Sequence, residues 1–500
     1  MKKIINFIIK EKWIFILFLL GIILRLIAIQ IDPFLHPWDE RFHALVARNM
    51  MDAPFTPILR VNPITDNYDP FIWCCNHIWL HKQPLFLWQM AISMKIFGVS
   101  LWSMRLPSAI MGALLILLIY RIIINMQFNR RIALLTAVML TFSCFHLQLI
   151  SGIQGMDHND VAHGFYILAS IWALTEYIKT KKWYWFVFIG VFSGAAILIK
   201  WLTGLFVYLI WGIYNLFLLL QKEKIKNLIV PFLLSLLVCL LIFGPWQLYI
   251  LTRWPELAQH EYEFNRRHIT EILEQNGGDF LFYYEHFSSL IGKYIYYFIP
   301  LGIIASLFYK KGRNKLSIAV LLSISFAFIF FNFIVKTKIP TYIFFIVPFF
   351  LFYIALLIDF IIKWFPSIGA QKALLILAGI TLAYLSLNPK YFIEYLSPAN
   401  TERANRIYNA EIYKNIREHI PDDVHVVLNM NSFEDIDVMF FNKGMTAYHW
   451  TLPQVDIEEM KEKKIKIAVF KEHGHYNIPS YLYEYPYIYI IDLDLKNFYE

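Results

Sequence analysis

The hydrophobic pattern of the chain consists of long apolar runs separated by short polar breaks, from Lys12 to about Leu387. A helix needs roughly 20 residues to cross about 30 Å of hydrocarbon, and most of the runs approach that length. The first run lacks a small-residue cleavage site, so it is interpreted as a retained anchor and not as a signal peptide. The pattern predicts about 11 membrane-spanning helices, near residues 13–30, 104–124, 132–150, 161–178, 184–199, 201–219, 228–246, 292–309, 316–335, 341–362 and 372–388. The shorter run "QPLFLWQMAISMKIFG" carries Lys95, which favours a helix lying in the membrane interface.

The pattern changes after about residue 390. Ile412, Ile416 and Ile420 recur at helical spacing, and a further helix is expected over 456–464. Strand-like runs are found at 424–429, 465–470 and 487–493. The sequence therefore predicts an all-α polytopic membrane domain over 1–389, with extracytoplasmic loops 31–103 and 247–291, and a small soluble α/β domain over 390–500. The second domain has no glycine-rich phosphate loop, so it is assigned no chemistry. It is interpreted as a domain that covers or positions something at the outer face of the membrane.

Composition and charge support a membrane protein. Apolar residues make up 58% of the chain and charged residues 16%. This apolar content is too high for one soluble core. Four lysines before the first span place the N-terminus in the cytoplasm, and the breaks that would then be cytoplasmic, such as "KTKKWYW" and "QKEKIKN", are basic. An odd number of spans places the C-terminal domain outside. We expect a multi-pass protein of the inner or plasma membrane, embedded in the lipid bilayer, with no nucleic-acid partner.

Cysteine usage leaves a metal site open. Cys144 and Cys239 lie within predicted spans, whereas Cys74 and Cys75 lie in the first outer loop. His77 and His81 share one face if that stretch is helical, so Cys75, His77 and His81 are candidate metal ligands. The alternative is a set of interfacial polar residues. No cofactor follows from the sequence, and a divalent cation is left open.

Ionisable residues gather in the breaks that are expected to face outward. An acidic pair, Asp39 and Glu40, opens a predicted helix in "HPWDERFHALVARNM", directly after the first span. Asp39 fits a helix cap, but Glu40 points about 100° away around the same helix, and a cap does not explain it. The two lysines of "KTKIPTY" depart from the positive-inside rule and favour an anionic partner. The other members of this group are His81, Lys82, Asp157, His158, Asp160, Lys200, Arg266, Arg267, Lys336, Lys338 and Tyr342.

Carboxylates and cations on one face of a membrane suit glycosyl transfer from a lipid-linked donor. A carboxylate takes the proton from an acceptor hydroxyl, while Lys or Arg stabilises the charge that develops on the departing phosphate. The phosphate of such a donor lies at the head-group level, where these loops emerge, and its polyprenyl tail fits between apolar helices. This pattern predicts an inverting transfer with Asp39 as the general base.

The order of several short motifs resembles that of a known superfamily. The motifs are "PWDERFHALVARNM", "HKQPL", "RLPSA", "HNDVAHGFYILA", "KWLTG", "GPWQLYI" and "TKIPTYIFFIVP". Over about residues 13–350 the chain resembles the GT-C glycosyltransferases of the protein O-mannosyltransferase and lipid A aminoarabinose transferase superfamily. The resemblance implies a polyprenyl-phosphate-linked sugar donor and a lipid, glycan or protein acceptor at the outer face of the membrane.

The resemblance also implies roles for single residues. Asp39 matches the acidic residue proposed as catalytic base, and Glu40 is its neighbour in the catalytic pair. Lys82 matches the lysine that contacts the donor phosphate, and Asp160 matches an acid of the second outer loop. Arg41 comes one residue earlier than the family's arginine, which turns its side chain by about 100° and puts its role as a phosphate ligand in doubt.

The rest of the predicted substrate-binding set lies on later loops. Lys338 and Tyr342 match a later phosphate-side group, and His81 and Arg266 complete the set. Structural alternatives exist for most of these residues. Lys82 and Lys338 can be lysines at span ends whose ammonium groups reach the interface. Asp160 can cap a helix, Arg105 can anchor a span, and Arg266 with Arg267 can form a solvated helical face.

A transporter or flippase of a lipid-linked sugar is the alternative function. Such proteins usually place ionisable groups near the middle of the membrane and often contain internal repeats. In this sequence the charges lie in loops or at span ends, and no repeat is visible. A structural scaffold would need no cluster of phosphate-binding lysines. The donor sugar and the acceptor stay open.

Overall fold

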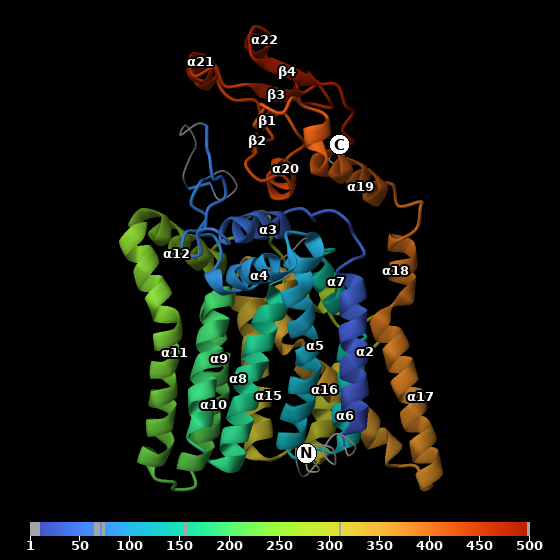
Figure 1. The fold of residues 1–500 in the computed structure, drawn as a ribbon. Helices are drawn as coiled ribbons and strands as arrows, with labels where there is room; N and C mark the ends of the chain where they lie inside the picture. The colour runs from blue at the N-terminus through green and yellow to red at the C-terminus, as the bar shows by residue number, and fades with distance from the viewer. Residues whose placement is uncertain (1–10, 65–70, 73–75, 155–158, 310–311, 498–500) are drawn as a thin grey trace. The chain divides into compact units, whose positions relative to one another are not determined.

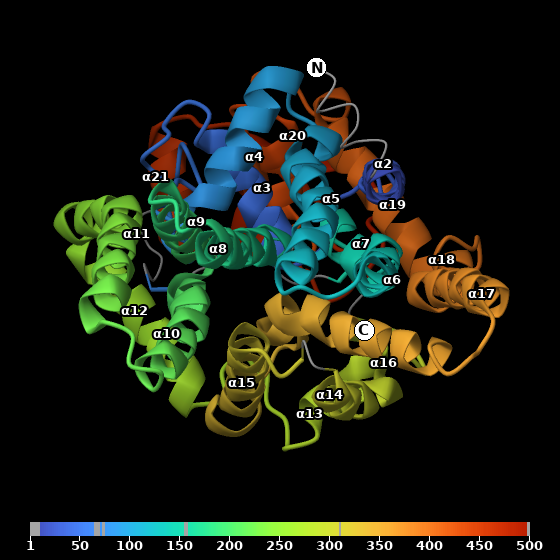
Figure 2. The same cartoon turned by 90° about the horizontal axis from the view of Figure 1, so that it is seen from below.

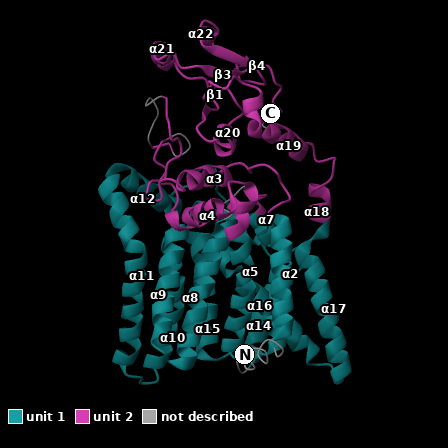
Figure 3. Cartoon of the chain, in the orientation of Figure 1, with its two compact units in different colours: residues 1–28, 108–150, 158–389 teal, residues 29–107, 151–157, 390–500 magenta. Residues whose placement is uncertain are grey.

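The computed structural model describes residues 11–64, 71–72, 76–154, 159–309 and 312–497 (Figure 1). The chain is mostly helical, with one small sheet near its C-terminal end. It forms two compact units (Figure 3). Unit 1 comprises residues 1–28, 108–150 and 158–389, and unit 2 comprises residues 29–107, 151–157 and 390–500. The predicted domain boundary between residues 389 and 390 stays a prediction.

Unit 1 is built from helices that run side by side in Figure 1 and are seen nearly end-on in Figure 2. Its α-helices are α2 (Lys12–Ala28), α5 (Leu101–Asn125, which begins in unit 2), α6 (Arg130–Thr141), α7 (Cys144–Ser151), α8 (Asp160–Thr180), α9 (Tyr184–Lys200), α10 (Phe206–Leu219), α11 (Ile225–Arg253), α12 (Pro255–Thr270), α13 (Phe282–Leu290), α14 (Ile299–Phe308), α15 (Lys315–Ile329), α16 (Val347–Ile362) and α17 (Ile368–Leu387). Short helical segments of other pitch are η1 (Trp201–Leu205), η2 (Tyr296–Phe298), η3 (Phe330–Ile334) and η4 (Pro340–Ile346).

Within the described residues, six helical segments are long and apolar enough to cross a membrane, and α6 with α7 make a seventh if this pair, bent by 43°, is one span. The predicted number of about 11 is therefore not confirmed. One reason is length, because α2 has 17 residues and Tyr296–Phe308 is a short apolar helix. Another is that α9, η1 and α10 follow one another without a break and are counted as one segment of 36 residues, Tyr184–Leu219, although two spans are predicted there.

Close packing in unit 1 depends on small residues where helices approach each other. α9 packs against both α8 and α11. A Cβ atom at Gly190 would lie 2.4 Å from the carbonyl oxygen of Ser235 on α11, so only glycine permits this approach. After α9 the chain turns back at η1, where the Ser193 hydroxyl donates to the carbonyl oxygen of Gly204 over 2.7 Å. This turn places the end of α9 and all of η1 beside the pocket described below.

Unit 2 combines the segment after the first span with the C-terminal part of the chain. Its helices are α3 (Asp39–Asn49), α4 (Pro84–Phe97), α18 (Pro389–Tyr395), α19 (Thr401–Lys414), η5 (Ile416–Glu418), α20 (Asp435–Phe441), α21 (Gln454–Glu462) and α22 (Ser480–Tyr483). Its strands are β1 (Val426–Leu428), β2 (Thr446–Tyr448), β3 (Ile467–Phe470) and β4 (Ile488–Ile491). The 14-residue helix α4 covers the predicted interfacial segment, and its place in the membrane interface stays a prediction.

The four strands form a parallel sheet in the order β2-β1-β3-β4. Val427 of β1 lies opposite Ala447 of β2 and Ala468 of β3. Parallel neighbours need crossover connections, which α20, α21 and α22 supply in chain order. The strands predicted from the sequence are present as β1, β3 and β4, whereas the three-residue β2 is too short to show an alternating pattern.

The helix predicted from Ile412, Ile416 and Ile420 is placed differently in the structure. It starts earlier, at Thr401, and ends at Lys414, and Ile416 opens the separate segment η5. Apolar residues of the sheet and of α21 and α22 form a buried cluster that includes Val426, Ile467 and Leu482. This C-terminal part of unit 2 is therefore a small α/β fold, as the sequence predicts.

Candidate functional site

The acidic pair lies in the first turn of α3. Trp38 precedes the helix with a backbone φ of 67°, which is not helical, so α3 begins at Asp39. Acidic residues in a first turn face the positive end of the helix dipole. Trp38 is the cap residue and makes no side-chain cap bond, so Asp39 is the first helical residue and does not cap the helix. Its carboxylate has a different partner.

Asp39 forms an ion pair with Lys82. The Nζ atom of Lys82 lies 3.4 Å from Oδ1 of Asp39, and both side chains are about one-fifth exposed, at 19% for Lys82 and 20% for Asp39. Lys82 precedes α4, which starts at Pro84, a residue suited to the first helical position. Two residues that the sequence assigns to different roles, from separate motifs, thus form a pair at a position that solvent reaches.

Glu40 is enclosed, although it follows Asp39 directly. Its side chain is fully buried, and Arg105 donates to both carboxylate oxygens, from Nε to Oε1 over 2.6 Å and from Nη2 to Oε2 over 3.0 Å. The backbone N–H of His36 also donates to Oε2 over 2.7 Å. A Cβ atom at Gly152 would lie 2.4 Å from the same oxygen, so no larger residue fits there. Glu40 therefore has no face open to a substrate and acts on the structure around it.

Arg105 connects this carboxylate to the chain that leads into α3. Its guanidinium donates to the carbonyl oxygens of Ile29, Asp32 and Phe34 over 2.8–3.2 Å. Charge-assisted bonds of this kind are roughly twice as strong as neutral ones. The buried Glu40–Arg105 pair thus fixes the loop before α3 and, through it, the position of Asp39.

Arg41 points to the C-terminal α/β fold of unit 2. Its guanidinium lies 3.2 Å from Oε1 of Glu434 and 2.8 Å from Oδ2 of Asp437, and all three side chains are buried. Both acids follow strand β1 near its carboxyl end, where open parallel sheets usually bind ligands. In this chain the side chain of Arg41, from α3, occupies that position. The structure therefore gives Arg41 two acidic partners, Glu434 and Asp437, so we do not include it among the phosphate ligands.

A second arginine, Arg60, also pairs with an acidic residue of the C-terminal α/β fold. Arg60 donates to Oδ2 of Asp435 over 2.5 Å and stacks over the rings of Tyr448 and Trp450, 4.9 and 5.5 Å from their centroids. His449 shares the same carboxylate over 3.0 Å. Burial acts to raise the pKa of Asp435, but the charges of His449 and Arg60 outweigh it and hold that pKa below its ordinary value.

The candidate metal ligands are only partly covered by the structure. Cys75 lies outside the described residues, as do Cys74, Asp157 and His158. The His81 ring packs edge-on against Trp79, with the ring centroids 5.7 Å apart. Across the part of the chain that the structure describes, no three His, Cys, Asp or Glu side chains gather as a metal site. The metal interpretation stays untested.

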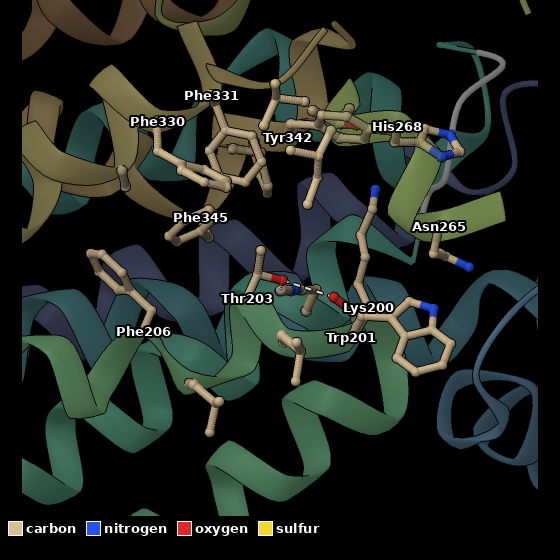
Figure 4. A pocket seen from close by; sticks show the side chains of 18 of the residues that line it. Lys200, Trp201, Thr203, Phe206, Asn265, His268, Phe330, Phe331, Tyr342 and Phe345 are labelled. Atoms are coloured by element: carbon tan, nitrogen blue, oxygen red, sulfur yellow. Dashed lines mark hydrogen bonds between the residues drawn. The ribbon is translucent and has the colours of Figure 1, made fainter. Parts of the chain in front are cut away.

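Unit 1 contains a pocket of about 840 Å³, which we call the Lys200 pocket (Figure 4). It is formed where α8, the turn η1 and α12 face η3 and η4. Figure 4 shows phenyl rings at one end and polar side chains at the other. The phenyl end includes Phe206, Phe330, Phe331 and Phe345, and the polar end includes Lys200, Asn265 and His268.

Lys200 is the central cation of this pocket. Its Nζ atom lies 2.7 Å from Oδ1 of the buried Asp160, and its side chain keeps 23% of its surface exposed. The same ammonium lies 5.3 Å from the ring centroid of Tyr342, a cation–π contact. Deeper in the pocket, Thr203 and Nε2 of His163 are 3.0 Å apart. The arrangement offers an anion one held cation beside an apolar channel.

Three predicted substrate residues of unit 1 differ in their relation to this pocket. Tyr342 lines it, as does Arg266, but the Arg266 guanidinium is 70% exposed and pairs with Glu263 one turn away on α12. Lys338 is buried outside the pocket lining, and its ammonium donates to the carbonyl oxygen of Asp279. Burial lowers the pKa of Lys338. We therefore do not include Lys338 among the donor-binding residues proposed below.

Comparison with known proteins finds a family model and solved structures that this chain resembles. The sequence model of the dolichyl-phosphate-mannose-protein mannosyltransferase family matches residues 81–249. ArnT from Cupriavidus metallidurans, solved bound to undecaprenyl phosphate, superposes with a TM-score of 0.60 at 13% identity, over 91% of this chain and 89% of that one. The oligosaccharyltransferase of Archaeoglobus fulgidus superposes with a TM-score of 0.57 at 15% identity, over 88% of this chain and 65% of that one. Residues 81–249 thus resemble the mannosyltransferase family, and the whole chain has the fold of these GT-C structures.

The family model and the shared fold agree with the resemblance seen in the motifs. The matched segment 81–249 contains Lys82, Asp160 and Lys200. The sequence matches no curated protein. The identities with the solved structures are low, so these structures establish the GT-C fold of the chain, and the residue roles rest on the geometry described above.

Sequence reasoning missed part of the Lys200 pocket. Lys200 belongs to the predicted ionisable group but not to the predicted substrate-binding set, although its position between two apolar runs was a usable signal. No sequence pattern points to Asn265 or His268, because they lie on α12, which meets η1 only in the folded chain. The phenylalanines that line the pocket cannot be distinguished by sequence from the others in a chain with 44 phenylalanines.

Proposed function

We propose that the chain is an integral membrane glycosyltransferase that moves a sugar from a polyprenyl-phosphate donor to a hydroxyl or phosphate of an envelope lipid, glycan or protein. The transfer takes place at the outer face of the membrane and inverts the anomeric carbon. The observation that carries the proposal is the Lys200 pocket, which combines a phenyl-lined end with an ammonium group.

The two ends of the pocket match the two parts of such a donor. A polyprenyl tail is apolar, and the phenyl rings offer it van der Waals contacts in place of those with the lipid chains. A phosphate is anionic, and a hydrogen bond to a charged partner such as the Lys200 ammonium contributes about 1.5–3 kcal/mol. Asp160 holds that ammonium in place. The undecaprenyl phosphate bound to ArnT supports a donor of this class.

The chemical step is assigned to Asp39. Its carboxylate accepts the proton of the acceptor hydroxyl while the hydroxyl oxygen bonds to the anomeric carbon. The bond between that carbon and the phosphate oxygen breaks, and its electron pair leaves with the polyprenyl phosphate. Attack from the side opposite the leaving group inverts the linkage. A general base of this kind contributes roughly 100-fold to 10,000-fold to the rate.

Lys82 and Glu40 support this step in different ways. The Lys82 ammonium holds the Asp39 carboxylate in place. Its positive charge stabilises the negative charge that develops as the phosphate leaves. Glu40 is buried against Arg105, and we assign it the positioning of α3.

Reconstitution tests the proposal against the flippase alternative. The full chain is placed in liposomes with undecaprenyl-phosphate mannose, glucose, galactose or aminoarabinose, each labelled in the sugar, together with an envelope extract. We expect one of these donors to lose its label to the extract and to leave undecaprenyl phosphate, and we expect Asp39→Asn to stop this. Parallel reactions with EDTA test the open question of a metal. Labelled donor that changes leaflet intact, with no cleavage, would establish a flippase and overturn the proposal.

A further inference from the structure

Unit 2 has a pocket of its own, of about 410 Å³, which we call the Tyr391 pocket. It lies between the loop that leads into α3, the residues Ile153 and Gln154, and the helices α18 and α19. Its volume falls in the range of about 300–1,000 Å³ that is usual for small-molecule sites. None of its lining residues belongs to the Lys200 pocket, and the proposed chemistry does not use it.

Aromatic rings form one part of the lining. Tyr391 and Tyr395 of α18 are stacked, with ring centroids 5.9 Å apart and planes 11° from parallel. Trp38 is 48% exposed although it is large and apolar. Its φ of 67° is strained for a bulky residue, and the contact of its ring with Phe433, at 5.5 Å, accompanies that conformation. Trp38 therefore contributes a half-exposed side chain to this lining, from an unfavourable backbone conformation.

The polar part of the lining is held by a network around Asp32. Arg403 donates to Oδ1 of Asp32 over 2.7 Å, and the Tyr395 hydroxyl donates to Oδ2 over 2.7 Å. His36 lies 3.1 Å from Oδ2. On the neighbouring turn of α19, Arg406 pairs with Glu402 over 2.8 Å. Further polar groups come from Gln154 and Asn400.

The charges of this pocket are balanced. Each arginine has a carboxylate partner, Asp32 for Arg403 and Glu402 for Arg406. A site for a lipid chain would be expected to be apolar throughout, and this lining is not. Flat aromatic faces beside alternating donors and acceptors instead match a pyranose ring, which has C–H faces and a rim of hydroxyls.

We infer that the Tyr391 pocket binds a saccharide unit of the acceptor. The assignment of the bound saccharide to the acceptor rests on the proposed function. The binding of a saccharide in this pocket does not depend on it. Trp38 lines the pocket and is followed directly by Asp39, so a sugar stacked on the indole is presented beside the proposed base. The acceptor class is therefore a glycan or glycolipid whose sugar rings enter this pocket.

Binding is tested first without any donor. Purified full-length protein in detergent is mixed with N-acetylglucosamine, chitobiose, methyl glucoside or glucuronic acid, and saturation-transfer NMR reports contacts to the sugar protons. At least one of these saccharides is expected to bind, and Tyr391→Ala and Arg406→Gln are each expected to weaken its binding roughly tenfold. Tyr483→Ala removes an exposed tyrosine of the same unit, outside the pocket, and serves as the control. Absence of binding by all four saccharides, or equal binding by wild type and both pocket variants, overturns the inference.

Transfer assays then separate the two proposals. Arg406→Gln is expected to raise the acceptor KM roughly tenfold and to leave the donor KM and kcat within about twofold. If the wild-type protein transfers sugar and the acceptor KM of Arg406→Gln is unchanged, the pocket assignment fails and the glycosyltransferase proposal stands. If saccharides bind but no donor is ever cleaved, the pocket stands as a saccharide site and the transferase proposal fails.

Discussion

The Nζ atom of Lys82 lies 3.4 Å from Oδ1 of Asp39, and the two side chains belong to separate motifs 43 residues apart. The pairing gives the carboxylate a fixed direction while solvent still reaches it. The next residue, Glu40, is fully buried and held by Arg105. Two adjacent carboxylates therefore have different environments, which allows their roles to be separated by experiment.

Asp39→Asn is expected to lower kcat about 100-fold or more, because the amide cannot take a proton from the acceptor. The substitution keeps the shape of the side chain and, as one-fifth of it is exposed, should leave the protein folded. Steady-state transfer is measured beside thermal unfolding of the same preparation. Normal turnover in this variant would remove Asp39 from the mechanism.

Glu40→Gln is expected to act on stability instead. It leaves the buried Arg105 guanidinium without its counter-charge, a change that costs about 3–5 kcal/mol for buried pairs. Thermal unfolding in detergent should show a clearly lower midpoint than for Asp39→Asn. Glu263→Gln breaks an exposed pair with Arg266 and is the matched control, with little effect on the midpoint. A Glu40→Gln protein as stable as wild type but inactive would move the catalytic role to Glu40.

Lys200→Gln is expected to raise the donor KM by about 10-fold to 150-fold, which corresponds to one lost charged hydrogen bond of roughly 1.5–3 kcal/mol. The acceptor KM should change little. Lys336→Gln removes an exposed cation outside the pocket lining and is the control for overall charge. Donor titrations at fixed acceptor concentration measure the effect, and equal donor KM values for the two variants would contradict the phosphate assignment.

Asp437 predicts a dependence of stability on pH. Burial raises the pKa of Asp437 to about 8, with Glu434, Asp435 and Glu40 acting in the same direction and Arg41 opposing them. Between the ordinary value of 3.8 and about 8, the folded protein keeps a proton that the unfolded chain has released. This group therefore makes the free energy of unfolding fall as pH rises through that window, by at most about 1.4 kcal/mol per pH unit.

Asp437→Asn removes this contribution, so the midpoint of unfolding should fall less between pH 5.5 and pH 8 than it does in wild type. The variant should also be the more stable protein at pH 8. Thermal unfolding at three pH values measures both effects, and Asp52→Asn, at a carboxylate that is 70% exposed, serves as the control. An unchanged slope in Asp437→Asn would show that the group is ionised throughout.

The orientation in the membrane is tested by labelling single cysteines in a chain whose own four cysteines are replaced by serine. Val455→Cys in the C-terminal fold is 66% exposed in the protein, and an impermeant maleimide should label it on intact cells. Leu220→Cys, 74% exposed in a basic break, should react only after permeabilisation. The reverse pattern would invert the predicted topology.

The sequence predicts those parts of the site that depend on local pattern. Asp39 follows Pro37 and opens an amphipathic helix, and Lys82 precedes a proline that starts the next one, so both can be recognised from neighbouring residues. The environment of Glu40 cannot be recognised in this way, because a glutamate in the sequence can be either exposed or buried in the folded chain. Its burial depends on Arg105 and on the close approach of Gly152, which only the folded chain brings together.

The fold shows the same division between local and distant information. Long apolar runs identify most helices, and Lys200, between the predicted spans 184–199 and 201–219, marks the turn at η1. Lys200 stands at that turn and therefore lines a pocket. Arg41 has a strong local context in α3, yet its partners Glu434 and Asp437 follow β1 near the other end of the chain.

The pairing of Arg41 with Glu434 has a consequence for biosynthesis, because the two residues are 393 positions apart. At about 5–20 residues per second, a ribosome needs on the order of 20–80 seconds to pass from one to the other. During that time the segment after the first span has been made but lacks the carboxylates that Arg41 and Arg60 require. Unit 2 therefore completes its folding only after its last strands have been synthesised, and a premature stop codon shortly before residue 430 would leave every proposed catalytic residue in the product while removing the partners that hold α3.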